Sequence, residues 1–151
     1  MQYDLIIIGM GISGISAGIY AKNSGLKILM LEKNMPGGLL NKISKINNYP
    51  GYREVTGPDL SLELFNSVNE LNIPYKIAEV EEIRVEKNKK IVKTTLGEFE
   101  SKYVIIASGR ESRKLGLPNE TKLLGRGIST CALCDGALYK SKDVIVVGGG
   151  S

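Results

Sequence analysis

The chain has 151 residues, of which 42% are hydrophobic and 24% are charged, enough for one packed domain or one domain and part of another. Its formal net charge is +4, but the lysines are spread out, and seven Tyr, two Phe and no Trp argue against a nucleic-acid-binding protein. No run of about 20 apolar residues is present, so we expect no membrane-spanning helix.

The first elements along the chain predict a βαβ unit. Leu5 to Ile8 and Lys27 to Leu31 are short apolar runs typical of buried parallel strands, and Ile15 to Asn23 between them predicts a helix rich in small residues. Gly25 stands where glycine often ends a helix. Since Asp4 precedes the first apolar run and glycines follow it, this start is not a signal peptide, and we expect a cytoplasmic protein.

The turn between the first strand and the helix carries the pattern G-x-G-x-x-G, with Gly9, Gly11 and Gly14. One glycine permits the tight turn, one lets the backbone approach a pyrophosphate, and one lets the helix and strand pack closely. Glu32 ends the second strand, about 20 residues further on, where an acidic residue binds ribose hydroxyls and repels a 2′-phosphate. The pattern predicts a dinucleotide site that disfavours NADP; the alternative is a glycine-rich structural turn.

A long loop and a second helix follow. Asn34 to Tyr52 is rich in Gly, Pro, Asn and Ser, and loops of this length are usually functional or disordered. The glycine motif alone does not distinguish FAD from NAD. Gly37 and Gly38 favour FAD, because a flavin needs a second segment to hold its far end. Thr56 then predicts a helix start, and apolar residues recur at helical spacing until Pro74.

The next region alternates short strands and turns. Tyr75 to Val85, Ile91 to Thr95 and Glu98 to Glu100 are predicted to form an antiparallel meander, and Tyr103 to Ala107 predicts another buried strand. Leu115 to Pro118 has the composition of a linker or domain junction. We therefore expect an α/β fold, a Rossmann-like domain with a parallel sheet and a small antiparallel β-meander.

Both cysteines lie in one Cys-x-x-Cys, formed by Cys131 and Cys134 and followed by Asp135. A structural zinc site needs four ligands, usually Cys or His, and this chain has two Cys and no His, so zinc would require a partner chain and we expect no metal. Inert buried thiols and a structural disulfide are further alternatives. Disulfide exchange needs one thiolate to attack and a second thiol to resolve the mixed disulfide, which favours a catalytic pair. Asp135 is the nearest candidate proton carrier, or else a helix cap or turn residue.

The order of these motifs resembles that of bacterial thioredoxin reductases of the low-molecular-weight type. Gly9 to Gly14 matches the glycine fingerprint of that family. Gly37 to Leu40 and Asn48 to Gly51 match its Gly-Gly-Gln-Leu and Asn-aromatic-Pro-Gly segments, and Ile105 to Gly109 matches an Ala-Thr-Gly segment beside FAD. Cys131 to Gly136 matches the redox centre, usually Cys-Ala-Thr-Cys-Asp-Gly.

The resemblance implies an FAD-binding domain over residues 1–112 and the start of an NADPH-binding domain over residues 113–151, in a homodimer. It implies electron flow from NADPH to FAD, to the disulfide of Cys131 and Cys134, and on to thioredoxin or a similar small disulfide protein, with Asp135 as the acid/base. The implied FAD contacts are Gly9, Gly11, Ile12, Ser13, Gly14, Glu32, Lys33, Gly37, Gly38, Leu39, Leu40, Asn48, Val80, Ala107, Ser108 and Gly109.

The last residues resemble the beginning of the NADPH site. Val144 to Val147 predicts an apolar strand, and Gly148, Gly149 and Gly150 follow it as a phosphate turn without its helix. Since members of the family are about twice as long, we expect the second domain to be truncated and the 151-residue chain alone to be inactive with NADPH. Two alternatives stay open: a flavin thioredoxin reductase fed by ferredoxin, whose distinguishing residues would lie beyond Ser151, and an FAD-binding module without its own electron donor.

Overall fold

The computed structural model describes residues 2–111 and 113–148, without the side chains of Leu133 and Cys134. The chain forms two compact units, Met1–Arg110 and Glu111–Ser151. None of the helices in the described residues is long and apolar enough to cross a membrane.

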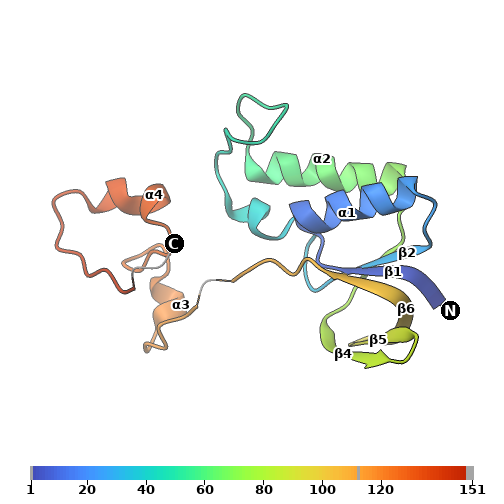
Figure 1. Ribbon diagram of the computed structural model, residues 1–151. Coiled ribbons are helices and arrows are strands. Elements are labelled where there is room, and N and C mark those ends of the chain that lie inside the picture. Colours follow the sequence, from blue (N-terminus) through green and yellow to red (C-terminus); the bar gives the residue numbers. More distant parts are fainter. Residues whose placement is uncertain (1, 112, 149–151) are drawn as a thin grey trace. The chain divides into compact units, whose positions relative to one another are not determined.

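The described residues of the first unit form one six-stranded sheet in the order β3-β2-β1-β6-β5-β4 (Figure 1). The pairs β3/β2, β2/β1 and β1/β6 are parallel, whereas β6/β5 and β5/β4 are antiparallel. The predicted α/β fold, with a parallel part and an antiparallel meander, is confirmed. In chain order the strands are β1 (Gln2–Ile8), β2 (Ile28–Glu32), β3 (Tyr75–Ile77), β4 (Val80–Glu86), β5 (Lys89–Thr94) and β6 (Gly97–Ile106).

The register of the parallel strands determines where the site can form. Leu31 of β2 and Ile106 of β6 pair with Ile8 of β1, one on each side. Because the three strands are parallel, their carboxyl ends lie at the same edge of the sheet. Ligands of open α/β sheets bind outside this edge. The segments that leave the three strands, including the glycine turn, therefore meet there.

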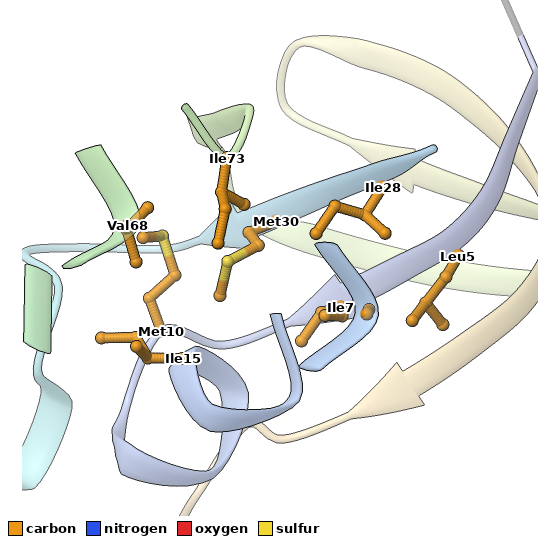
Figure 2. Packing of buried hydrophobic residues seen from close by; sticks show 9 residues of the cluster. Leu5, Ile7, Met10, Ile15, Ile28, Met30, Val68 and Ile73 are labelled. Carbon is orange, nitrogen blue, oxygen red and sulfur yellow. The ribbon is translucent and has the colours of Figure 1, made fainter. Parts of the chain in front are cut away.

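Helices α1 (Ile12–Asn23) and α2 (Gly57–Glu70) pack against each other and cover one face of the parallel strands (Figure 1). Figure 2 shows buried side chains from β1, β2 and both helices converging between these layers. Full burial of each large apolar side chain contributes about 1.5–3 kcal/mol. The buried members of this cluster are Leu5, Ile7, Met10, Ile15, Ala21, Ile28, Met30, Val68 and Ile73.

The opposite face of the same strands packs against the meander. Ile6, Leu29 and Leu31 alternate with the helix-facing residues and form a second cluster with Ala78 and Val92. Side chains alternate between the faces of a strand, so β1 and β2 are apolar on both faces. This explains why each predicted strand is a continuous apolar run rather than an alternating one.

The predicted start of the second helix is confirmed. Thr56 is the N-cap of α2, and its Oγ1 accepts a 3.2 Å hydrogen bond from the backbone N–H of Asp59. Pro58 lies within the first turn, where its missing N–H costs no helical hydrogen bond. The helix ends at Glu70, four residues before Pro74.

Two strand predictions differ from the structure because strand boundaries depend on partners. The strands expected at Glu98 to Glu100 and Tyr103 to Ala107 are one strand, β6, whose first half pairs with β5 and whose second half pairs with β1. Conversely, the single strand expected at Tyr75 to Val85 is two strands. β3 pairs with β2 and β4 pairs with β5, so the chain changes partner at Ala78 and Glu79.

The second unit contains two short α-helices in its described part, α3 (Glu120–Leu123) and α4 (Ala132–Asp135), and a 3-10 turn η2 (Gly136–Tyr139). The strand predicted at Val144 to Val147 is wrong for this structure. These four residues are 60–92% exposed and belong to none of the described strands. An apolar run becomes a strand only where a neighbouring strand takes up its backbone hydrogen bonds.

Candidate functional site

The glycine turn after β1 is held by close backbone contacts. Gly9 has φ +101°, and a Cβ added there would overlap the carbonyl oxygen of Ala107. A Cβ added at Gly14 would overlap the carbonyl oxygen of Gly9. The first and third glycines of the pattern therefore let the turn, the helix and the chain after β6 pack together.

Gly11 is different, because a Cβ added there has no described atom within 4 Å, and its φ of −78° suits any residue. Gly11 is the N-cap of α1 and, as a glycine, has no side chain that could cap the helix. Ile15 N donates to Gly11 O at 3.0 Å, so the three preceding N–H groups have no carbonyl one turn back. Open space, N–H groups and the positive end of the helix dipole make this turn suitable for an anion.

Glu32 lies at the end of β2, with its carboxylate beside the glycine turn. Its Oε2 accepts a 2.7 Å hydrogen bond from Met10 N, and its Oε1 accepts one of 3.0 Å from Asn34 N. A carboxylate has about four lone-pair sites, so these two bonds leave acceptor capacity for hydroxyl groups. The side chain is half-buried, which fixes its position while leaving one side accessible.

The second glycine pair lies against the first glycine turn. Gly37 N donates a 2.7 Å hydrogen bond to Met10 O. The nearest atom to a Cβ added at Gly38 is Gly11 Cα, at 4.0 Å. The 3-10 turn η1 (Gly38–Lys42) follows and buries Leu40. Two loops that are far apart in the sequence thus line one region at the carboxyl edge of the sheet.

The chain after β6 completes this region. Ala107 N donates a 2.7 Å hydrogen bond to Ile8 O, and Ala107 Cβ lies 3.5 Å from a Cβ added at Gly14. Ser108 and Gly109 follow and are exposed. The structure therefore brings together the glycine turn, Glu32, the Gly37–Gly38 loop and Ala107.

The other predicted cofactor contacts lie around this region or apart from it. Ala78 N donates a 2.7 Å hydrogen bond to Glu32 O, so the segment leading to half-buried Val80 passes the end of β2. Lys33 forms a 2.8 Å ion pair with Glu79. Leu39 and Asn48 are exposed, and the described contacts do not link Asn48 to the glycine turn.

Sequence reasoning missed Met10, which joins three parts of the site through its backbone. Its N–H binds Glu32, its carbonyl accepts from Gly37, and its side chain is fully buried. Met10 occupies a variable position of the glycine pattern, so its identity carries no signal. Only the apolar character of its side chain hints at its place in the core.

The cysteine segment of the second unit has its own hydrogen-bond network. Cys131 is disulfide-bonded, and the chain has one other cysteine, Cys134, whose side chain lies outside the described part. Asp135 N donates a 3.0 Å hydrogen bond to Cys131 O. Ser129 Oγ lies 2.7 Å from Asp135 Oδ2 and accepts a 3.1 Å hydrogen bond from Cys131 N. Sequence reasoning did not predict a role for Ser129.

A buried carboxylate holds the loop at the beginning of the second unit. Glu120 accepts hydrogen bonds from the backbone N–H groups of Leu115, Gly116 and Leu117, at 2.9, 2.8 and 3.3 Å. Hydrogen bonding from Leu115, and then from Gly116 and Leu117, lowers the pKa of Glu120 despite its burial. Of the predicted second nucleotide turn, Gly148 has φ +94°, whereas Gly149 and Gly150 lie outside the described residues.

Comparison with known families decides the relationship. The family described as pyridine nucleotide-disulphide oxidoreductase matches residues 3–151. The chain belongs to this family. Within it, the chain is 41% identical over 148 residues to the thioredoxin reductase of Bacillus subtilis (strain 168), and 41% identical over 149 residues to that of Ureaplasma parvum. These matches cover 98% and 99% of this chain but 47% and 48% of the relatives.

Solved structures of thioredoxin reductases agree with this relationship. The thioredoxin reductase of Lactococcus lactis in the FR conformation has a TM-score of 0.78 and 39% identity, over 91% of this chain and 45% of that one. A ferredoxin-flavin thioredoxin reductase of Clostridium acetobutylicum has a TM-score of 0.72 and 34% identity, over 92% of this chain and 48% of that one. The predicted homology to bacterial thioredoxin reductases is confirmed, and the chain spans about half the length of the curated relatives it matches.

Proposed function

We propose that this chain carries the FAD site and the redox disulfide of a flavin-dependent thioredoxin reductase. The observation that carries the proposal is the meeting of Gly11, Glu32 and Gly38 at one edge of the parallel sheet. Gly11 leaves open space beside free N–H groups, and Glu32 supplies acceptors, as an adenine dinucleotide requires. The similarity to thioredoxin reductases over 98% of the chain supports the same function.

The residues at this edge fit FAD. The N–H groups at the start of α1 would hold the diphosphate, Glu32 would accept the ribose hydroxyls, and the backbone near Val80 would approach the adenine. When bound, FAD supplies the two-electron chemistry that connects an electron donor to a disulfide. The remaining proposed contacts are Lys33, Gly37, Gly38, Leu39, Leu40, Asn48, Ala107, Ser108 and Gly109.

We propose that Cys131 and Cys134 are the disulfide that receives these electrons. The disulfide at Cys131 supports this, because a Cys-x-x-Cys pair can close and open without moving the chain far. Reduction of the pair takes two electrons and two protons and gives two thiols. Asp135, whose backbone is hydrogen-bonded to Cys131, is the proposed acid/base.

The proposed electron donor is NADPH, bound by a second Rossmann-like domain that begins at residue 113 and includes Gly148, Gly149 and Gly150. The proposed acceptor is thioredoxin or a similar small disulfide protein, and the proposed assembly is a homodimer. Ferredoxin is the second candidate donor. The similarity to a ferredoxin-flavin thioredoxin reductase, at 34% identity and a TM-score of 0.72, supports ferredoxin as this second candidate.

We further propose that these 151 residues alone do not couple NADPH oxidation to disulfide reduction. Val144 to Val147 are exposed and belong to none of the described strands, so they offer no formed sheet on which a nicotinamide cofactor could bind. The chain also spans about half the length of its relatives. The expected result is FAD binding and a reducible disulfide without turnover.

The experiment is to purify the chain with FAD and titrate its thiols before and after mild reductant. The proposal predicts two additional thiols per chain and no stoichiometric zinc. The same sample is then assayed with NADPH, and separately with reduced ferredoxin, using a protein disulfide as acceptor. Stoichiometric zinc with no change in thiols would overturn the redox assignment. Turnover of about 1 per second or more with NADPH would overturn the proposed inactivity.

A further inference from the structure

Ser129 connects the backbone of Cys131 to the carboxylate of Asp135 through a single hydroxyl group. Its oxygen accepts a 3.1 Å hydrogen bond from Cys131 N. Two acceptors lie within reach of its one proton, Asp135 Oδ2 at 2.7 Å and Cys131 O at 3.3 Å. The shorter distance and the charge of the carboxylate favour donation to Asp135.

This arrangement does more than cap a turn. A Ser side chain that accepts from the N–H two residues ahead is a common local motif, and it explains the bond to Cys131 N alone. This local motif does not account for the second contact of Ser129, with the carboxylate of Asp135 six residues further along the chain. The bond from Ser129 to Oδ2 restricts rotation of the Asp135 carboxylate, so the orientation of both carboxylate oxygens is fixed.

We propose that Ser129 is a positioning residue that fixes the orientation of the Asp135 carboxylate next to the redox disulfide. The proposal rests on the proposed function in one respect, the role of Asp135 as acid/base for the Cys131–Cys134 pair. It adds a residue that acts through Asp135.

The step that Ser129 supports is thiol–disulfide exchange. One thiol of the reduced pair loses its proton to solvent, and its sulfur attacks the acceptor disulfide. A new S–S bond forms, the acceptor S–S bond breaks, and the leaving sulfur takes from Asp135 a proton that the carboxylate has first taken up from solvent. The second thiol then gives its proton to the Asp135 carboxylate as its sulfur attacks the mixed disulfide, and the released sulfur takes that proton from Asp135. Two electrons and two protons thus pass to the acceptor, and the pair ends as a disulfide.

The test uses the chain after chemical reduction and desalting, so it needs neither flavin nor electron donor. Two disulfides are compared as electron acceptors. Bis(hydroxyethyl) disulfide releases an alkyl thiolate, which leaves more easily when it is protonated, whereas a nitrobenzoate disulfide releases an acidic aryl thiolate that leaves without a proton. The variants are Ser129→Ala, Ser129→Thr, Asp135→Asn and the double variant Ser129→Ala with Asp135→Asn. Thr130→Ala is the matched control, because it removes a neighbouring exposed hydroxyl that makes none of the described hydrogen bonds.

We expect Ser129→Ala to slow reduction of the alkyl disulfide by about fivefold to tenfold, within the range typical of the net contribution of one intramolecular hydrogen bond. With the nitrobenzoate disulfide, the rate of Ser129→Ala should differ from that of the unchanged chain by less than about twofold. Ser129→Thr keeps a hydroxyl group and should reduce the alkyl disulfide at the unchanged rate. The double variant should be as slow as Asp135→Asn alone. Equal slowing with both acceptors, or additive effects in the double variant, would overturn the positioning role. If Asp135→Asn itself has no effect, the proposed function of Asp135 fails instead, which separates the two outcomes.

Discussion

The backbone N–H of Met10 donates a 2.7 Å hydrogen bond to Oε2 of Glu32, 22 residues further along the chain. The carbonyl of Met10 accepts an equally short bond from Gly37 N. One residue of the glycine turn is therefore tied both to the acid at the end of β2 and to the second glycine loop. The proposed dinucleotide site is therefore held in place by backbone contacts within the chain.

Gly11→Ala and Gly14→Ala should separate cofactor binding from folding. Since a Cβ at Gly11 meets none of the described atoms, Gly11→Ala should lower the melting temperature only slightly, through the poorer N-cap, but weaken FAD binding about tenfold or more, equivalent to ~1.4 kcal/mol. A Cβ at Gly14 overlaps Gly9 O, so Gly14→Ala should lower the melting temperature. Thermal unfolding and flavin titration of both variants check this. Unchanged FAD affinity in Gly11→Ala would argue that the diphosphate binds elsewhere.

Glu32→Ala should reduce FAD occupancy and loosen the glycine turn, because Met10 N and Asn34 N both lose their acceptor. Asp4→Ala is the matched control: Asp4 accepts a 3.0 Å bond from Lys27 N and pairs with Lys102, but it lies near the opposite end of β1. Flavin absorbance per chain after purification is the measurement. Equal flavin loss in both variants would mean that Glu32 acts through stability alone.

Ser101→Ala should leave stability unchanged or raise it by up to about 1 kcal/mol. Ser101 is fully buried, and its hydroxyl has no hydrogen-bond partner among the described residues. Thr94→Val provides the contrast, since the buried hydroxyl of Thr94 donates to Gly97 O at 2.9 Å and accepts from Leu96 N at 3.1 Å. Urea unfolding should show a loss for Thr94→Val only. A clear loss for Ser101→Ala would reveal an unrecognised partner.

The loop held by Glu120 should open as the pH falls. Hydrogen bonds from Leu115, Gly116 and Leu117 favour the charged form, so the pKa of Glu120 is lower in the folded protein than in the unfolded chain. The stabilising contribution is therefore complete at neutral pH and is lost as the pH falls through the lowered pKa. NMR titration of the Gly116 amide should give a midpoint below the ordinary glutamate value, and Glu120→Gln should abolish it. A midpoint at or above that value would contradict the assignment.

Local sequence signals predicted the elements that are determined by local chemistry. The glycine turn, the apolar runs of β1 and β2 and the Thr56 cap each follow from residue type and spacing. The continuity of β6, and the finding that Val144 to Val147 belong to none of the described strands, could not be predicted in this way. Both depend on whether a neighbouring strand supplies hydrogen-bond partners, which the composition of the run does not reveal.

Parts of the candidate site that are formed by a particular side chain could be predicted from the sequence. Parts that are formed by backbone groups could not. Glu32 could be proposed as a site residue because an acidic residue at a strand end is a chemical signal, and the structure places its carboxylate beside the glycine turn. The contacts of Met10 with Glu32 and Gly37 are made by groups that every residue except proline offers. Ser129 was not predicted for a related reason. A serine two residues before a cysteine carries no chemical signal in the sequence, and only the folded chain brings its hydroxyl close to Asp135.

The most direct test of the central claim is an NMR titration of the isotopically labelled chain with FAD. The account predicts the largest amide shifts at Gly11, Ile12 and Ser13, with smaller ones at Asn34 and Gly38, and loss of these shifts in Gly11→Ala. Saturating FAD that leaves the amides of the glycine turn unmoved, or that shifts only residues remote from the carboxyl edge of β1 and β2, would contradict it.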